Sequence, residues 1–188
     1  IYCGFTSIAA KYGDTELAVS SIIMKLLMLY SYFLDGFAYA GEALTGKYIG
    51  ANDRVALGKA VKYLFGWTAL LVVISTAAYW VGGEWMISLM TTQQSVIDAS
   101  SPYIIWLILM PLFSCAAFMW DGIYIGATAS VAIRNCMIWA CVAFYITYFA
   151  LKASMGMQAL YCAYFAHIIV RAAYMTLFAR REVFSKVS

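Results

Sequence analysis

Long uninterrupted apolar runs are the feature that most limits what this chain can fold into. A helix needs about 20 consecutive apolar residues to cross the hydrocarbon core of a bilayer. The sequence is 65% hydrophobic and only 11% charged, whereas soluble domains are near half apolar and a quarter charged. Too little polar surface remains to cover a water-soluble core. Five runs of sufficient length lie near residues 17–45, 57–82, 99–124, 133–152 and 157–179.

These runs predict an all-α fold, a polytopic transmembrane helical bundle that forms one membrane-embedded unit over residues 1–188. The alternating apolar and polar strands of a membrane barrel are absent from the sequence. Residues 1–11 begin apolar and lack the basic segment of a signal peptide, so we expect them to be the end of a truncated helix. The prediction is therefore five full spans plus the end of a sixth, with no internal repeat.

Polar turns between the runs carry residues that favour helix termini. Asp and Asn side chains accept hydrogen bonds from free N–H groups at a helix start, and a Thr-x-x-Gln pattern forms a reciprocal capping box. Proline is tolerated in a first turn, because its missing N–H is unbonded there anyway. The expected caps are Asp14 or Thr15, Asn52 or Asp53, and the Thr91–Gln94 box, with Pro102 in a first turn.

Pro111 lies in the middle of a predicted span. It removes the backbone hydrogen bond to the carbonyl of Leu107 and is expected to kink the helix. We expect this bend to line a cavity.

The charges of the loops are distributed unequally between the two sides of the membrane. One side carries eight Lys and Arg residues and the other carries two, a bias typical of cytoplasmic loops. The 46–60 loop, the 125–134 loop and the C-terminus are therefore expected in the cytoplasm. The eight are Lys47, Arg54, Lys59, Lys62, Arg134, Arg180, Arg181 and Lys186, and the two are Lys11 and Lys152.

Several functional classes are disfavoured by what the sequence lacks. It has no Walker loop, H-E-x-x-H, G-x-S-x-G or haem-binding spacing, so we expect no enzyme, no catalytic residues and no cofactor. A net charge of +3 is too weak for a nucleic-acid partner. The five cysteines have no metal-ligand spacing and are expected to be small buried hydrophobic residues. No metal site is predicted.

Six ionisable side chains lie inside the predicted spans. Each costs roughly 3 kcal/mol or more in the hydrocarbon, so such groups usually face protein or water. They are the candidates for a substrate or ion pathway: Lys25, Asp35, Glu42, Asp121, His167 and Arg171.

Two carboxylates, Asp35 and Glu42, are seven residues apart and therefore lie on one face of a helix. A carboxylate in a cavity that opens and closes can take up and release a proton. The alternative is a structural pair with a Lys or Arg of a neighbouring helix. For Glu42, which lies near the interface, we expect the structural pair, and for Asp35 both alternatives stay open.

The other candidates have simpler expected roles. Asp121 is expected to pair with Arg134 and fix the corner between two helices. His167 and Arg171 are four residues apart and share a helix face. We expect His167 to be a packing group rather than a proton relay, and Arg171 to pair with a carboxylate of another helix. Lys25 is expected to snorkel towards the membrane surface.

Two glycine pairs, Gly46-x-x-x-Gly50 and Gly122-x-x-x-Gly126, have the spacing that lets membrane helices approach closely. We expect them to serve packing, not activity.

Three stretches carry a family resemblance. Residues 34–53, LDGFAYAGEALTGKYIGAND, resemble a motif of the multidrug and toxic compound extrusion (MATE) family. Residues 120–128, WDGIYIGAT, resemble the tenth helix of one branch of that family together with its inner loop, and residues 91–103 resemble the segment before that helix. The resemblance covers nearly the whole chain.

The resemblance implies the C-terminal half of a twelve-helix transporter with two six-helix lobes. Such a protein is a secondary antiporter of a bacterial inner membrane, in which a proton or sodium gradient drives export of organic, often cationic, compounds. The implied partners are the lipid bilayer, the missing N-terminal lobe and small organic substrates.

One family feature is not carried over. The ion-binding acid in the tenth helix of the sodium-coupled branch would fall near Ser114 and Cys115, and neither residue is acidic. In the branch that the chain resembles, coupling is associated with an aspartate of the first helix, so the resemblance implies a coupling site in the absent N-terminal lobe.

Two other functions stay open. A flippase for a lipid-linked oligosaccharide would need a more cationic cavity than three acids, two Lys or Arg residues and one His provide. A non-transporting membrane assembly subunit would leave the buried charges unexplained.

Overall fold

The computed structural model describes residues 2–187, with side chains from residue 4 onward. Within that range the chain is helical, without strands, and five helical segments are long and apolar enough to cross a membrane. The predicted number of spans is thereby confirmed. The helices are α1 (Tyr2–Ala9), α2 (Asp14–Gly50), α3 (Arg54–Met90), α4 (Gln94–Ser100), α5 (Ile104–Gly126), α6 (Ser130–Met155) and α7 (Gln158–Glu182), with 3-10 turns at Ser101–Tyr103 and Phe184–Lys186.

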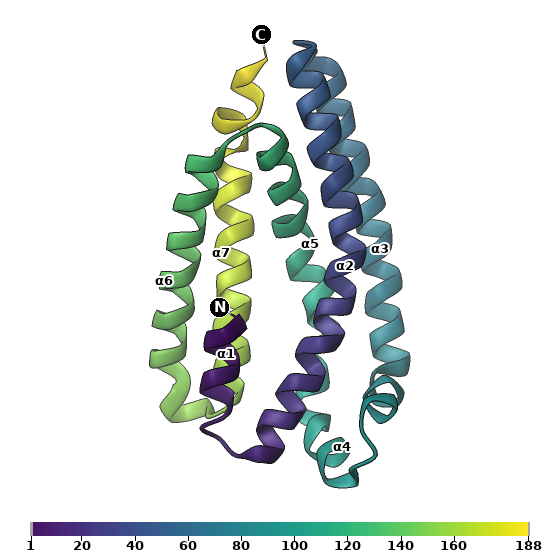
Figure 1. The fold of residues 1–188 in the computed structure, drawn as a ribbon, viewed down its shortest axis with the longest axis vertical. Coiled ribbons are helices and arrows are strands. Elements are labelled where there is room, and N and C mark those ends of the chain that lie inside the picture. The colour runs from purple at the N-terminus through teal and green to yellow at the C-terminus, as the bar shows by residue number, and fades with distance from the viewer. Residues whose placement is uncertain (1, 188) are drawn as a thin grey trace.

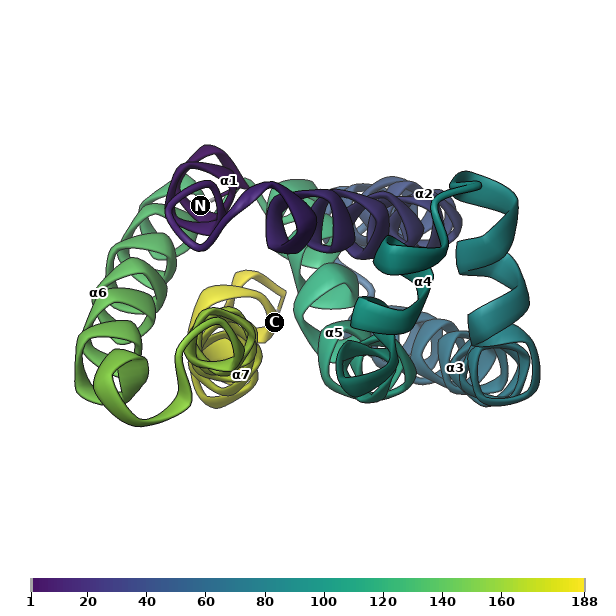
Figure 2. The same cartoon turned by 90° about the horizontal axis from the view of Figure 1, so that it is seen from below.

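The long helices run side by side along the longest axis of the molecule (Figure 1). Seen from below, α6 and α7 lie on one side with α1, whereas α2, α3 and α4 lie on the other (Figure 2). Helix α5 stands between them and packs against α2, α3 and α7. It therefore joins the two sides of the bundle.

Helices α2 and α3 are longer than their hydropathy predicts. Each has 37 residues, or about 56 Å, against a hydrocarbon thickness of about 30 Å. Helix α3 continues to Met90, past the expected end at 82, because Ile87 is fully buried and Gly83 packs against Ile104. Packing, and not the end of the apolar run, sets this boundary.

Both turns at the end that holds the C-terminus are shorter than expected. The 46–60 and 125–134 loops reduce to residues 51–53 and 127–129. The same four residues, Tyr-Ile-Gly-Ala, lead into both turns, at 48–51 and at 124–127. The next residue, Asn52 or Thr128, has a positive φ of 52° or 53°. The two turns thus share a four-residue sequence and a backbone conformation.

The hydrogen bonds of the two turns also match. In each, the N–H of the positive-φ residue donates to the isoleucine carbonyl, and the following N–H donates to the tyrosine carbonyl. These bonds satisfy the free carbonyls at a helix end. We call residues 48–53 and 124–129 the two corners.

The predicted caps of the two long helices have different outcomes. Asp53 caps α3, because its Oδ1 accepts the N–H of Ala56 at 2.8 Å, as predicted. The cap of α2 is Gly13 rather than Asp14 or Thr15. Gly13 has a φ of 122°, which glycine adopts readily, and this moves Asp14 into the first turn, where its charge suits the helix dipole.

The predicted capping box at Thr91 and Gln94 does not form. Thr91 accepts the backbone N–H of Gln93 at 3.2 Å, and the Gln94 amide donates to Asp98 at 2.8 Å. Gln93 is the N-cap of α4, so Thr91 lies outside that helix. Pro102 is in the first turn of its 3-10 segment, as predicted.

The tightest helix crossing is between α2 and α5, at Gly122 and Gly126. A Cβ atom on Gly122 would lie 2.0 Å from the carbonyl oxygen of Ala38, and one on Gly126 would lie 2.3 Å from that of Glu42. In the other predicted pair, a Cβ atom on Gly46 would lie 3.6 Å from the carbonyl oxygen of Gly126, whereas Gly50 has open space around it. The packing role is confirmed for the first three of these glycines.

Helix α1 lies within residues 1–11 and packs against α7; that it is the end of a longer helix stays a prediction. Its Phe5 is fully buried, with ring centroids 5.3 Å from Tyr161 and 6.1 Å from Tyr164, both on α7. Edge-to-face geometry suits such aromatic pairs.

Pro111 is buried inside α5, and the helix is continuous through it. The Tyr30 hydroxyl of α2 donates to the Pro111 carbonyl at 3.3 Å. Pro111 thus packs against α2 in this conformation, and the expectation that it lines a cavity stays a prediction. The bend itself stays a prediction.

Candidate functional site

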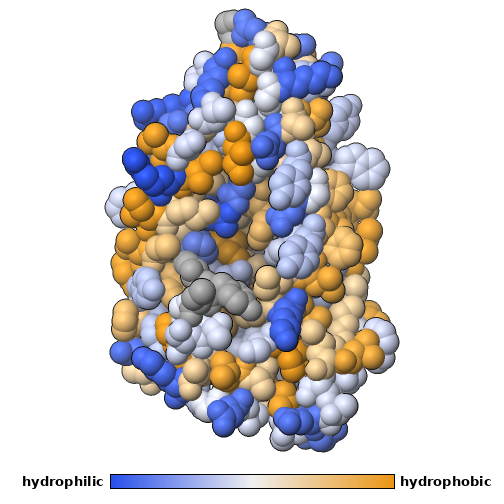
Figure 3. Space-filling model, in the orientation of Figure 1, coloured by the Kyte–Doolittle hydropathy of each residue, from blue (hydrophilic) through white to orange (hydrophobic). Residues whose placement is uncertain are grey.

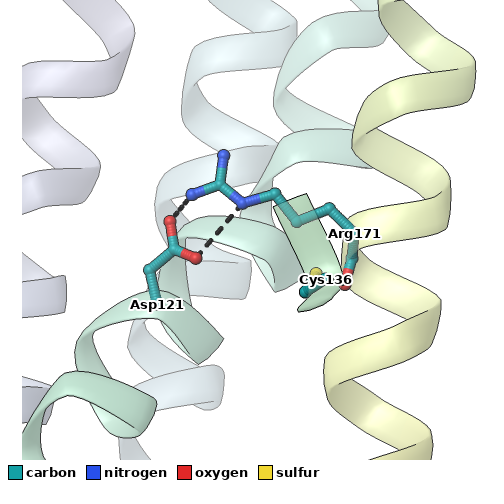
Figure 4. A network of polar contacts seen from close by, with 3 residues as sticks. All are labelled: Asp121, Cys136 and Arg171. Carbon is teal, nitrogen blue, oxygen red and sulfur yellow. Dashed lines mark hydrogen bonds and ion pairs between the residues drawn. The ribbon is translucent and has the colours of Figure 1, made fainter. Parts of the chain in front are cut away.

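An ion pair between Arg171 of α7 and Asp121 of α5 lies between these two helices (Figure 4). The Arg171 Nε–H donates to Oδ1 of Asp121 at 3.2 Å, and a second guanidinium nitrogen contacts Oδ2. The side chains are only 14% and 18% exposed, respectively. Charge-assisted contacts of this two-point kind fix geometry as well as adding energy.

Neighbouring groups hold Arg171 in place. The Cys136 thiol of α6 donates to the Arg171 carbonyl at 3.6 Å, and the Phe118 ring of α5 lies 5.7 Å from the guanidinium carbon. A cation over an aromatic face is attracted by the ring quadrupole. Three helices therefore position this arginine.

Two hydrogen bonds on the same interface tie α5 to α7 beyond the ion pair. The Trp120 indole N–H donates to the Thr176 hydroxyl at 2.9 Å, and the Tyr124 hydroxyl donates to the Met175 carbonyl at 2.6 Å. The sequence analysis did not identify these links. Trp120 and Tyr124 each carry a polar group that needs a hydrogen-bond partner when buried. Their position inside a predicted span was therefore the signal in the sequence for these links.

Asp35 of α2 is the second carboxylate near Arg171. It is half-buried and interacts electrostatically with the Arg171 guanidinium. Among the residues that the structure describes, Asp35 has no side-chain hydrogen bond and no ion pair within 4 Å. Among the described residues, Asp121 is thus the one carboxylate in contact with the guanidinium. The three side chains together carry a net charge of −1 when all are ionised.

The expected pair between Asp121 and Arg134 is wrong. Arg134 is exposed on α6, and its guanidinium contacts the side chain of Asn135 at 3.4 Å. Asp121 is instead held by Arg171, because α5 and α7 pack side by side. The expectation that Arg171 pairs with a carboxylate of another helix is confirmed.

Glu42 and Lys25 lie apart from this group. Glu42 is half-buried, its backbone contacts Gly126, and within the described part of the chain its carboxylate has no ion pair. The structural pair expected for Glu42 is therefore not formed. Lys25 is exposed on α2, and its snorkelling stays a prediction.

His167 is 6% exposed, and its ring stacks on Tyr164 with centroids 6.5 Å apart. Its Nδ1 has no hydrogen-bond partner, and no hydrogen bond joins it to Arg171 within the described residues. The stacked ring agrees with a packing role, and the structure offers no partner for a proton relay at Nδ1.

The remaining predictions concern metals and cysteines. Within residues 2–187, no cluster of three or more His, Cys, Asp or Glu residues is placed to hold a metal ion. Cys136 is buried, whereas Cys115, Cys141 and Cys162 are half-buried, and all four are free thiols. Full burial was therefore predicted correctly for one of these four, and the side chain of Cys3 lies outside the described residues.

The face in Figure 3 is hollowed near its middle, between α2 and the side formed by α6 and α7, with hydrophilic side chains around the hollow.

Comparison with known proteins identifies the family. The MatE family model matches residues 2–149, a range that holds Asp35, Glu42 and Asp121 but not Arg171. DNA damage-inducible protein F of Escherichia coli (strain K12) is 30% identical over 177 residues, which are 94% of this chain and 38% of that protein. The chain thus spans well under half the length of this curated relative. Its sequence and its bundle of membrane-length helices agree that the chain belongs to the MATE family.

Proposed function

We propose that this chain is the C-terminal lobe of a secondary antiporter of a bacterial inner membrane. The transporter exports organic compounds, often cationic, by alternating access, in exchange for protons or sodium ions. Family membership supports transport, and the relative's greater length supports a second lobe. The partners are the lipid bilayer, the N-terminal lobe and small organic substrates.

The observation that carries this proposal is the group formed by Asp35, Asp121 and Arg171. These residues come from three membrane-length helices and lie within the bundle. Ionisable groups at such positions are costly and are retained mainly for substrate or ion pathways. The net negative charge of the three groups suits a cationic cargo.

The charge distribution supports a cytoplasmic position for both corners and the C-terminus. These segments lie at one end of the molecule (Figure 1), and Lys186 donates to the Ala127 carbonyl and to the Thr128 hydroxyl of the second corner. Reporter fusions at the C-terminus test this orientation: a fused green fluorescent protein should fluoresce, and a fused alkaline phosphatase should be inactive.

Dye efflux from proteoliposomes that contain the full-length protein tests the transport proposal. Ethidium should leave the vesicles when a proton or sodium gradient is imposed, and separate gradients distinguish the two ions. Nigericin, which exchanges protons for potassium ions, should abolish proton-driven efflux. Equal efflux with and without any gradient, or none at all, would contradict the proposal.

The flippase alternative has less support. A pyrophosphate cargo needs free cationic groups, but Arg171 is held by Asp121 and Lys25 is exposed. Gradient-independent movement of a lipid-linked oligosaccharide by the same proteoliposomes would favour the flippase. An assembly subunit predicts no movement of either compound.

A further inference from the structure

A groove lies between α2 and α3, next to the first corner. Its volume is about 440 Å³, and Tyr48 of α2 forms part of one wall. The other wall is a stripe on α3 that includes Ala56, Ala60, Tyr63 and Trp67. These four residues are three or four positions apart and therefore share one face of the helix. The groove thus runs along the seam between the two helices.

Lysine side chains surround the end of this groove that is nearer the corner. Lys59 lines the groove and is exposed. The ammonium group of Lys47 lies 5.5 Å from the centre of the Tyr48 ring, which forms the opposite wall. Among the residues that the structure describes, neither lysine has an ion pair within 4 Å. The carboxylate of the corner, Asp53, is occupied as the cap of α3, so this end of the groove carries uncompensated positive charge.

The distribution of charge along α3 shows how deep the groove lies in the bilayer. Residues 63–83 carry no charged side chain and are flanked by Lys62 and Glu84. This stretch is about 32 Å long, which matches a hydrocarbon thickness of about 30 Å. Lys59 therefore lies at the level of the lipid headgroups, whereas Trp67 lies just inside the hydrocarbon. Aromatic side chains are enriched at this depth.

We propose that this groove binds an anionic phospholipid. Its phosphate contacts Lys47 and Lys59, and its acyl chain lies along Tyr63 and Trp67. Basic residues at the membrane surface attract anionic lipids, and an acyl chain in the groove covers apolar surface of both helices. This inference goes beyond the proposed function. It requires a membrane-spanning chain but no particular cargo or coupling ion.

The shape of the groove favours a phospholipid over a free anion or a neutral lipid. A free phosphate ion would use the lysines and leave the apolar part of the groove empty. A neutral lipid would use the apolar part and leave the lysines without a counter-charge. Tyr63 and Trp67 are 69% and 60% exposed, so their rings are free to contact an acyl chain.

A second groove continues the same seam towards the middle of the bilayer. It has a volume of about 280 Å³ and is lined on α3 by residues that include Leu71 and Ile74. These follow Trp67 at spacings of four and three residues, so they extend the same face. The hydroxyl of Tyr79, which also lines this groove, donates to the Leu26 carbonyl. An acyl chain therefore finds a largely apolar path below the headgroup.

Binding of defined lipids to the full-length protein in detergent, measured by native mass spectrometry, tests the role of the lysines. The wild type should bind phosphatidylglycerol more tightly than phosphatidylcholine with the same acyl chains. Lys47→Gln combined with Lys59→Gln should bind phosphatidylglycerol roughly thirtyfold more weakly, since each basic residue near an anionic lipid contributes about 1 kcal/mol. Arg180→Gln combined with Arg181→Gln is the matched control. It removes the same charge from exposed positions and should bind like the wild type.

Filling the groove without changing its charge tests the role of the acyl chain. Ala60→Trp places a large side chain in the groove and should also weaken the binding of phosphatidylglycerol. The control is Ala69→Trp, because Ala69 is exposed and lies nine positions from Ala60, on the opposite side of α3. If Ala60→Trp does not fold, Ala60→Leu replaces it.

A photoreactive acyl chain locates the bound lipid in the wild type. Phosphatidylglycerol with a diazirine in one chain should label peptides from residues 56–74. Labelling elsewhere but not in these peptides, as expected if the N-terminal lobe covers the groove, would overturn the inference.

The remaining outcomes also decide the matter. Equal binding of the two lipids, or unchanged binding in the double lysine variant, would show that the lysines do not select an anionic lipid. Displacement of phosphatidylglycerol by inorganic phosphate, or unchanged binding in Ala60→Trp, would show a site for a free anion instead. Each of these results overturns the inference but leaves the proposed function untouched. Conversely, a protein that binds the lipid here and exports no dye contradicts the proposed function alone.

Discussion

Arg171 on α7 holds Asp121 on α5, with its Nε 3.2 Å from Oδ1 and a second nitrogen on Oδ2. The two residues are 50 positions apart in sequence. This pair is the charged link within the interface that joins the α6–α7 side of the bundle to α5.

Replacing one partner of this ion pair should destabilise the lobe more than replacing both partners. Asp121→Leu or Arg171→Met leaves one charge without its partner and should cost about 3 kcal/mol, whereas the double variant should recover most of that loss. Reversible unfolding in mixed micelles measures the free energies. Arg181→Met is the control, because Arg181 is 80% exposed and such surface pairs contribute little. Additive losses in the double variant would contradict the prediction.

The contact between α2 and α5 should not tolerate a side chain at Gly122. In Gly122→Ala the new methyl group would meet the Ala38 backbone, so the helices must separate, at a cost of about 3 kcal/mol. The melting temperature in detergent reports this loss. Gly66→Ala has open space around it on α3 and should be neutral or slightly stabilising. Equal melting of the two variants would count against the prediction.

The C-terminal 3-10 turn should detach when Lys186 is replaced. Lys186→Met loses the bonds to Ala127 and Thr128, and amide exchange in residues 184–187 should rise roughly tenfold, a change of about 1.4 kcal/mol in local opening. Hydrogen–deuterium exchange measures it. Arg180→Met changes an exposed arginine of α7 and should leave the exchange unaltered. Unchanged exchange in Lys186→Met would show that burial of Val183 and Val187 alone holds the segment.

Pro111→Ala should straighten α5. Alanine restores an N–H that can bond to the Leu107 carbonyl, and loss of the bend should slow the exchange between transport states. Spin labels at Ile105 and Ile125, both half exposed, report the end-to-end distance of the helix, which should lengthen. An unchanged distance together with unchanged efflux would show that Pro111 does not bend the helix.

Hydropathy and local capping chemistry were sufficient to predict the spans and one of the two caps tested on long helices. Asp53 caps α3 as expected, because the cap depends on residues three positions apart. The end of α3 could not be predicted in this way, since Ile87 and Gly83 are buried by contacts with other segments.

The partner of Asp121 could not be read from sequence. Arg134 lies just past the second corner and is close along the chain, but its side chain points outward on α6. Arg171 is distant in sequence, and its approach depends on α5 packing beside α7. Two opposite charges deep within separate spans gave a better indication of pairing than nearness along the chain.

The two corners lie at the same end of the molecule, together with the C-terminus. With the orientation that we propose, the basic residues at that end stay on the side of the ribosome throughout biosynthesis. Insertion then requires translocation only of the connections at the opposite end, which carry few charges. The α3–α5 and α6–α7 hairpins, whose connections lie at the opposite end, can therefore enter the bilayer from the same side.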